Sequence, residues 1–188
     1  MSSLHPQVYA PAEDTRLLLD AALRTIRPGD RVLEIGTGSG EIAVSLLDGT
    51  VEVAATDINP YAASLAYSRG VPVIRTDLFA GICGTFDLIL FNPPYLPTAP
   101  DERIDDWLEY ALDGGDNGRE TIERFLATAA ACLSARGKIL LLISSLTGIP
   151  EVAGLFTKAG MISFSVAEEM CEGERLVVLL GMKDLCSV

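Results

Sequence analysis

Short apolar runs that are typical of strands alternate with helical patterns along most of the 188-residue chain. The pattern predicts strands at 31–35, 51–56, 71–75, 86–91 and 138–143, and helices over 15–25, 41–47, 60–68, 118–134 and 150–159. This alternation favours a mostly parallel sheet with helices on both faces. No helix separates the last two predicted strands, 161–166 and 175–180, so they should form an antiparallel C-terminal hairpin. We expect one α/β domain over residues 1–188, built on seven strands.

The chain is acidic, with a formal net charge of -12 at pH 7. An acidic surface repels phosphate backbones, so direct nucleic-acid binding is not expected. No apolar stretch is long enough to cross a membrane and no signal pattern opens the chain, which predicts a cytoplasmic protein without a membrane partner. Cys83, Cys132, Cys171 and Cys186 are scattered and His5 is the single histidine, so no metal site is expected within the chain.

A glycine turn follows the first predicted strand, with the spacing Gly36-Thr37-Gly38-Ser39-Gly40. Glycines at a strand-to-helix turn let a ligand approach the backbone closely. Glu34, just before the turn, can receive a cationic ammonium group. The alternative is purely structural, since tight turns between a strand and a helix need glycine in any case.

Acids follow the next two predicted strands. Asp57 lies about 20 residues past the glycines, where an acid suits a ribose diol; it can equally cap the helix that follows Asn59 and Pro60. Asp77 and the backbone N–H of Leu78 can bind an adenine amino group and ring nitrogen, or Asp77 can simply be a turn residue. Because carboxyl ends of parallel strands share one edge, these positions predict a single crevice.

The fourth predicted strand ends in Asn92-Pro93-Pro94-Tyr95. Two prolines stiffen the turn and hold Asn92 and Pro93 in extended geometry. The Asn92 side chain and the Pro93 carbonyl then become fixed hydrogen-bonding groups beside the flat face of Tyr95. This arrangement suits a planar NH2 group, although a proline-rich turn that only ends a strand has the same composition.

In combination, these motifs resemble the class I, Rossmann-like S-adenosylmethionine-dependent methyltransferases, and most closely the HemK-type protein-glutamine N5-methyltransferases. The segments 9–15, 56–60 and 114–120 resemble the short archaeal and eukaryotic branch of that family. The resemblance implies S-adenosyl-L-methionine as cofactor and S-adenosyl-L-homocysteine as product. It implies that Asn92, Pro93, Pro94 and Tyr95 hold the substrate amide, and that the cofactor is bound by Thr15, Glu34, Gly36, Gly38, Gly40, Asp57, Ile58, Asp77, Leu78 and Asn92.

The same resemblance implies a substrate and a partner. The branch methylates the glutamine of the Gly-Gly-Gln motif in class I translation release factors, and works as a heterodimer with a small zinc-binding activator subunit. The short strand 71–75 should lie at a sheet edge, where a partner strand can extend the sheet. Residues 1–28 would form a lid segment and first helix and residues 29–188 the catalytic part; Glu13, Asp14 and Thr15 either cap that helix or close over the cofactor.

Three other functions stay open at the level of sequence. Adenine N6 or guanine N2 of a nucleic acid also offers a planar amino group, but the chain has no basic stripe for phosphates. A lysine side chain of another protein stays open as an additional substrate, and a non-catalytic cofactor-binding scaffold is the alternative of another class. The chain also departs from the family pattern, because Leu112 and Asp113 precede Gly114 where other members have tryptophan, and Trp107 lies further back.

Overall fold

The computed structural model describes residues 4–98 and 106–184, and a seven-stranded sheet runs through it with the order β3-β2-β1-β4-β5-β7-β6. Strands β1 to β5 are parallel, and β7 pairs antiparallel with both β5 and β6. This confirms the predicted α/β sheet with an antiparallel edge. The strands are β1 (Arg31–Ile35), β2 (Glu52–Asp57), β3 (Val73–Arg75), β4 (Phe86–Phe91), β5 (Leu133–Ser144), β6 (Met161–Cys171) and β7 (Glu174–Lys183).

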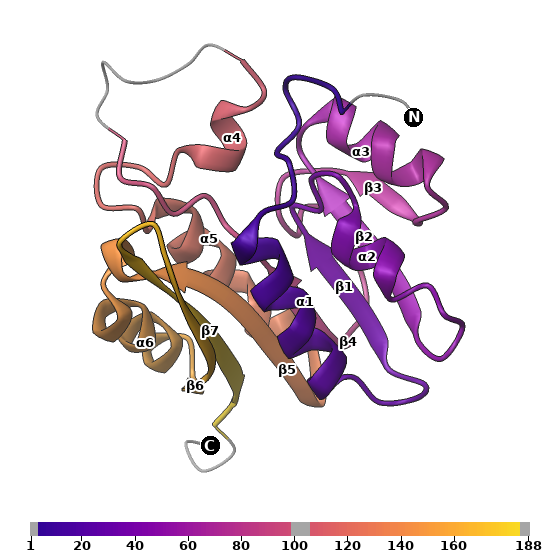
Figure 1. Ribbon diagram of the computed structural model, residues 1–188. Coiled ribbons are helices and arrows are strands. Elements are labelled where there is room, and N and C mark those ends of the chain that lie inside the picture. The colour runs from indigo at the N-terminus through magenta and orange to yellow at the C-terminus, as the bar shows by residue number, and fades with distance from the viewer. Residues whose placement is uncertain (1–3, 99–105, 185–188) are drawn as a thin grey trace.

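Helices cover both faces of the sheet (Figure 1), and each face has its own hydrophobic cluster. Helices α5 and α6 pack on one face, whereas α1, α2 and α3 pack on the other. The helices are α1 (Glu13–Thr25), α2 (Glu41–Ser45), α3 (Pro60–Ser68), α4 (Glu109–Leu112), α5 (Glu120–Ala129) and α6 (Ile149–Lys158), with 3-10 turns η1 (Ala130–Cys132) and η2 (Ser145–Thr147). None of the helices described is long and apolar enough to cross a membrane.

Helix α1 follows from its amphipathic pattern. Its apolar residues Leu17, Leu18, Ala21 and Ala22 are buried, as the 3.6-residue period predicts. The helix begins at Glu13, earlier than predicted, and its first turn buries Asp14 and Thr15 as well. The first turn of α1 lies at the carboxyl edge of the sheet, so the buried side chains of Asp14 and Thr15 line the predicted crevice.

Several predicted boundaries are wrong, and at three of them tertiary contacts override local pattern. Strands β6 and β7 pair as far as Cys171 and Glu174, so the predicted connection 168–174 is mostly strand, and its outward-facing acids had hidden it. The helix predicted over 118–134 stops at Ala129, because Leu133 is buried and already pairs with β4. The predicted loop 96–118 contains α4 and a bridge between Leu96 and Asp113; residues 99–105 lie outside the described part.

Candidate active site

A cavity of about 240 Å³ opens at the carboxyl edge of the parallel strands. It lies where sequence predicted the crevice, at the ends of β1, β2 and β4 and in the segment after β3. The structure brings nearly all the predicted site residues to its wall: Thr15, Glu34, Gly36, Gly38, Asp57, Ile58, Asp77, Leu78, Asn92, Pro93, Pro94 and Tyr95. Gly40 is not among the residues that line it.

Glu34 lies at the buried end of the cavity, with 5% of its surface exposed. Its Oε2 accepts hydrogen bonds from the Thr37 hydroxyl at 2.6 Å and from the Ala43 backbone N–H at 3.1 Å. Burial raises the pKa of Glu34 to about 8, although the two hydrogen bonds lower this pKa in part. The carboxylate therefore joins the glycine turn to α2, and a cationic ligand would favour its ionised form.

The three glycines of the turn have two different roles. Gly36 and Gly38 have positive φ values of 63° and 55°, which glycine adopts without strain, and both line the cavity. Gly40 also has a positive φ, but a Cβ there would lie 2.9 Å from the Cβ of Ala66. Gly40 thus allows α2 to pack closely against α3, while the first two glycines give a ligand access to the backbone.

Asp57 ends β2 and is buried, with 7% of its surface exposed. Its Oδ2 accepts from the Gly38 N–H and its Oδ1 from the Asn59 N–H, both at 2.8 Å. Burial raises the pKa of Asp57, and the backbone bonds lower it in part. The predicted helix cap is instead the neighbour Asn59, whose side chain accepts from the Tyr61 N–H, so Asp57 organises the turn and faces the cavity.

Thr56 precedes Asp57 and also lines the cavity. Its side chain is 1% exposed, and its Oγ1 has no hydrogen-bond partner among the residues that the structure describes. A buried hydroxyl of this kind costs about 1–3 kcal/mol of stability. An unsatisfied polar atom beside a cavity is one of the signs of a site built for a ligand.

Asp77 and Leu78 follow β3 on the far side of the cavity. Asp77 forms an ion pair with Arg124 of α5, which also lines the cavity. Leu78 has a φ of +48°, a left-handed backbone conformation that a leucine adopts only when its surroundings hold it there. The surrounding structure therefore holds the backbone of the Asp77-Leu78 pair in this one conformation at the cavity wall.

Asn92 connects the cavity to the N-terminal helix. Its Nδ2 donates a hydrogen bond of 3.0 Å to Oδ2 of Asp14, which is 78 residues away in the chain. Its Oδ1 is shielded from solvent and accepts no hydrogen bond within residues 4–98 and 106–184. The turn 92–95 therefore carries a polar acceptor that the described protein leaves without a donor.

Two tyrosines flank this pair. The Tyr9 hydroxyl donates to Oδ2 of Asp14 at 2.9 Å, and Tyr95 is half-buried against the cluster under α1. Burial first, and the charge of Asp14 second, raise the pKa of both phenols well above the ordinary value. Tyr9 and Tyr95 are thus neutral hydroxyls at neutral pH, and the Tyr9 hydroxyl is a donor to the Asp14 side chain.

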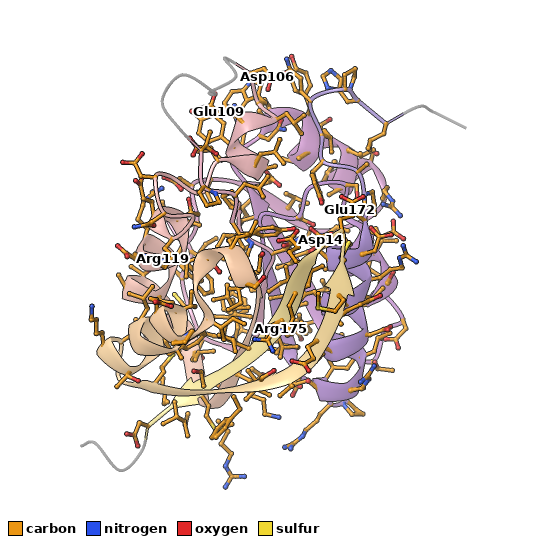
Figure 2. The ribbon with its side chains drawn as sticks, turned by 60° about the vertical axis from the view of Figure 1, so that its left-hand side comes forward. Asp14, Asp106, Glu109, Arg119, Glu172 and Arg175 are labelled. Carbon is orange, nitrogen blue, oxygen red and sulfur yellow. The ribbon has the colours of Figure 1, made fainter. Side chains whose placement is uncertain are left out.

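The segment around α4 closes the cavity from above. Trp107 and Tyr110 line it and stack on each other with ring centroids 5.3 Å apart, and the Arg75 guanidinium lies 5.5 Å from the Trp107 ring. Figure 2 shows Asp106 and Glu109 of this segment at the top of the molecule, well above Asp14. Trp107 therefore lies at the cavity although it is not next to the Gly114-Gly115 pair.

The ionisable side chains that line the cavity are mostly acids. The lining includes the acids Asp14, Glu34, Glu41, Asp57 and Asp77, whereas Arg124 is a lining cation that is already paired. Such a wall suits a ligand with net positive charge. No group of three potential metal ligands lies together in the described part of the chain.

Sequence reasoning misses several lining residues, among them Asp14 as a partner of Asn92, Arg124 as a partner of Asp77, and Trp107. Asp14 had been interpreted as a helix cap or a lid residue, and Arg124 lies on a predicted helix without any motif. A signal for Asp14 did exist, because an acid among the buried positions of an amphipathic helix needs a polar partner. No sequence pattern near Asp14 identifies Asn92 as that partner, because the two residues lie 78 positions apart.

Comparison with known proteins agrees with this geometry. The methyltransferase small domain family matches residues 8–104. A putative protein N5-glutamine methyltransferase of Methanocaldococcus jannaschii is 45% identical over 155 residues, which covers 79% of this chain and 78% of that protein. The human methyltransferase HEMK2 is 34% identical over 188 residues, covering 92% and 88% of the two chains.

One similar solved structure is that of the E. cuniculi Mtq2-Trm112 complex, which is responsible for methylation of the eRF1 translation termination factor. A chain of that structure superposes on this one with a TM-score of 0.79 and is 30% identical to it. The match covers 95% of this chain and 99% of that chain. The sequence matches extend through the glycine turn, the acids after β2 and β3, and the turn 92–95. The chain belongs to the HemK-type family of S-adenosyl-L-methionine-dependent protein N5-glutamine methyltransferases.

Proposed function

We propose that this protein methylates N5 of the glutamine in the Gly-Gly-Gln motif of a class I peptide chain release factor. The observation that carries the proposal is the shielded Oδ1 of Asn92, an acceptor without a donor at the substrate end of an acidic cavity. A glutamine amide presents the N–H donor that this oxygen lacks. Similarity to the Mtq2 chain, whose complex with Trm112 methylates eRF1, supports the choice of substrate.

The cavity fits S-adenosyl-L-methionine in shape and in charge. Gly36, Gly38 and Glu34 would receive the cationic amino acid portion, and Asp57 the ribose hydroxyls. Ile58, Asp77 and Leu78 would surround the adenine, with Asn92 at the methyl end and Thr15 closing the site from α1. Gly40 would act indirectly, by keeping α2 and the turn in place.

Residues before α1 would serve as the lid. Gln7 accepts a hydrogen bond of 2.6 Å from Asn59, and the His5 ring stacks on Tyr61 at 3.9 Å. Tyr9 and Pro11 line the cavity. These contacts tie the N-terminal segment to the start of α3 beside the cavity, and they support a division into a lid over residues 1–28 and a catalytic part over residues 29–188.

The chemistry asked of the protein is modest. The cofactor supplies an electrophilic methyl group on a sulfonium. Asn92 Oδ1 and the Pro93 carbonyl would accept the two N–H bonds of the substrate amide, which aims its nitrogen lone pair and stabilises the positive charge that develops there. Pro94 would keep the turn rigid, and Tyr95 would pack against the amide plane. No strong base is required before attack, because the proton can leave to water afterwards.

The decisive experiment measures methyl transfer to purified release factor, with mass spectrometry to locate the methyl group. The control substrate is the same factor with the motif glutamine changed to glutamate, which removes the N–H donors. We expect methylation only of the glutamine form. Equal labelling of both factors would reject the proposal. Labelling of DNA or RNA instead would establish the nucleic-acid alternative, and cofactor binding without methyl transfer to any of these substrates would establish the scaffold.

A heterodimer with a small zinc-binding activator subunit is part of the proposal. Strand β3 lies at the edge of the sheet, and its Ile74 is 52% exposed. Tyr67, on the neighbouring helix α3, is 71% exposed. A partner strand added to β3 would cover Ile74. We expect that Ile74→Lys abolishes co-purification with such a subunit, whereas Ile162→Lys on the opposite edge does not. A subunit that still binds the Ile74 variant would place the interface elsewhere.

Two finer points follow from the same substrate. Release factors act on cytoplasmic ribosomes, so the cytoplasm is the proposed location. Lysine methylation of another protein remains a second candidate activity, because Asp14 beside Asn92 supplies negative charge that an amine would also favour. Replacing the motif glutamine of the release factor by lysine, and measuring transfer to it, tests this point.

A further inference from the structure

The carboxylate of Asp14 is buried between the N-terminal segment and the substrate end of the cavity. Only 3% of Asp14 is exposed, although it belongs to the first turn of a helix. A buried charge persists only where hydrogen bonds compensate for lost hydration, so its partners define its role.

The two oxygens of Asp14 have different partners. Oδ1 accepts from the backbone N–H and from the hydroxyl of Thr15, which are contacts within the helix end. Oδ2 accepts from the Tyr9 hydroxyl at 2.9 Å and from Asn92 Nδ2 at 3.0 Å, which are contacts with two other segments. The Oδ1 contacts complete the helix, whereas the Oδ2 contacts are not needed to start it.

The contact with Asn92 decides which way its side-chain amide points. An ionised carboxylate accepts hydrogen bonds and donates none. Asn92 must therefore turn its NH2 group toward Asp14, and its Oδ1 is left as the free acceptor. With the opposite orientation, the amide would present a donor where the substrate N–H needs an acceptor.

Charge strengthens the same effect. A negative oxygen bonded to Nδ2 polarises the amide and increases the negative charge on its Oδ1. Positive charge develops on the attacking nitrogen during methyl transfer, close to that oxygen. The burial of Asp14 keeps the interaction strong, because little water screens it.

We propose that Asp14 is a positioning residue for methyl transfer, which orients and polarises the Asn92 side chain. The proposal rests on the proposed role of Asn92 in holding the substrate amide. It assigns a catalytic consequence to an N-terminal residue that does not itself touch the reacting atoms. It also means that order in the N-terminal segment is required for a competent substrate site.

The test begins with Asp14→Asn, which conserves size and removes the charge. The side-chain amide introduced at this position can donate or accept, so Asn92 no longer has one preferred orientation. We expect kcat to fall by on the order of 100-fold, as for loss of one preorganised group. The affinity for S-adenosyl-L-homocysteine should change by less than about threefold, and the unfolding midpoint should show that the variant is folded. Asp20→Asn, in the same helix but away from the cavity, is the matched control.

The exchanged double variant Asp14→Asn with Asn92→Asp separates positioning from a general structural defect. The amide introduced in α1 can donate to one oxygen of the carboxylate introduced after β4, and the second oxygen of that carboxylate remains an acceptor for the substrate. We expect kcat at least about tenfold above that of Asp14→Asn alone. A purely structural role predicts no recovery, so a double variant no better than the single one would overturn the proposal, as would wild-type kcat in Asp14→Asn.

A measurement on the unaltered protein keeps the proposal testable if the variants do not fold. In 15N-labelled protein, one side-chain amide proton of Asn92 should be shifted downfield and protected from exchange with water by its bond to Asp14. Exchange at the rate of a free amide would overturn the proposal. If wild-type protein does not methylate the release-factor glutamine, the proposed function fails instead, which is a separate outcome.

Discussion

The carboxylate of Asp57 accepts a hydrogen bond of 2.8 Å from the backbone N–H of Gly38. This bond joins the carboxyl end of β2 to the glycine turn after β1. The second oxygen of Asp57 accepts from the N–H of Asn59, which caps α3. One buried side chain therefore holds two loops of the cofactor site in register, and its remaining lone pairs face the cavity.

Replacing Asp57 by alanine should weaken cofactor binding. Hydrogen bonds to a charged group contribute about 1.5–3 kcal/mol, which corresponds to an affinity loss of about 10- to 100-fold. Calorimetric titration with S-adenosyl-L-homocysteine measures the change. Asp48→Ala is the control, because Asp48 accepts hydrogen bonds from Thr50 within its own turn and lies outside the cavity lining. An unchanged affinity in the Asp57 variant would place the ribose elsewhere.

Replacing Asn92 by alanine should separate binding from turnover. Cofactor affinity is expected to stay within a few-fold of wild type, since the other contacts of the nucleoside are intact. The kcat should fall by about 100- to 1,000-fold, the loss found for one preorganised hydrogen-bonding group. Single-turnover methyl transfer to release factor provides the rate. Turnover at the wild-type rate would contradict the proposed role of the 92–95 turn.

Glu34 makes the stability of the free protein depend on pH. Its pKa rises from an ordinary 4.5 to about 8 on folding, so the folded state holds a proton that the unfolded state releases. The corresponding stability is fully present below about pH 4.5 and is lost as the pH rises through about 8. Glu34→Gln removes this dependence. Thermal unfolding should show the variant gaining on wild type as the pH increases from 5 to 8, and a constant difference would argue against a buried, protonated Glu34.

The same residue should couple cofactor binding to proton release. A cationic ligand favours the ionised carboxylate, so the affinity of wild-type protein for S-adenosyl-L-methionine should rise between pH 6 and 7.5, below the pKa of about 8. Calorimetry in buffers of different ionisation enthalpy measures the released proton directly. In Glu34→Gln both the pH dependence and the proton release should disappear. Proton uptake on binding would be inconsistent with this placement of the ligand.

Replacing Gly40 by alanine tests its role in the packing of α2 against α3, which the glycine motif alone does not reveal. In Gly40→Ala the new Cβ would lie 2.9 Å from the Ala66 Cβ, and the φ of +78° would add backbone strain. We expect a loss of about 3 kcal/mol in urea unfolding. Gly29→Ala has a similar positive φ with nothing within 4 Å, so its smaller loss isolates the backbone cost. Equal losses in the two variants would mean that α2 and α3 adjust freely.

Much of the fold and of the cofactor cavity could be predicted because it depends on local pattern. Strand β4 has the predicted bounds, and β1 does as well, since short apolar runs between turns leave few alternatives. Once the strands are parallel, the residues after them must meet at one edge, which placed Asp57, Asp77 and Asn92 together. The strand between 168 and 171 was missed because an edge strand exposed on much of its surface loses the apolar alternation.

Local pattern is enough to predict the succession of strands and helices along the chain, the edge of the sheet at which the motifs gather and the chemistry that they carry, because these depend on residues close together in the chain. The pairing of residues far apart in the chain, Asp14 with Asn92 and Arg124 with Asp77, becomes visible in the folded structure alone. The folded structure also shows that Gly40 has a packing role, unlike Gly36 and Gly38, which line the cavity. The physical reason is that the partner of a buried polar group is chosen by the packing of whole elements, and no local pattern records that choice.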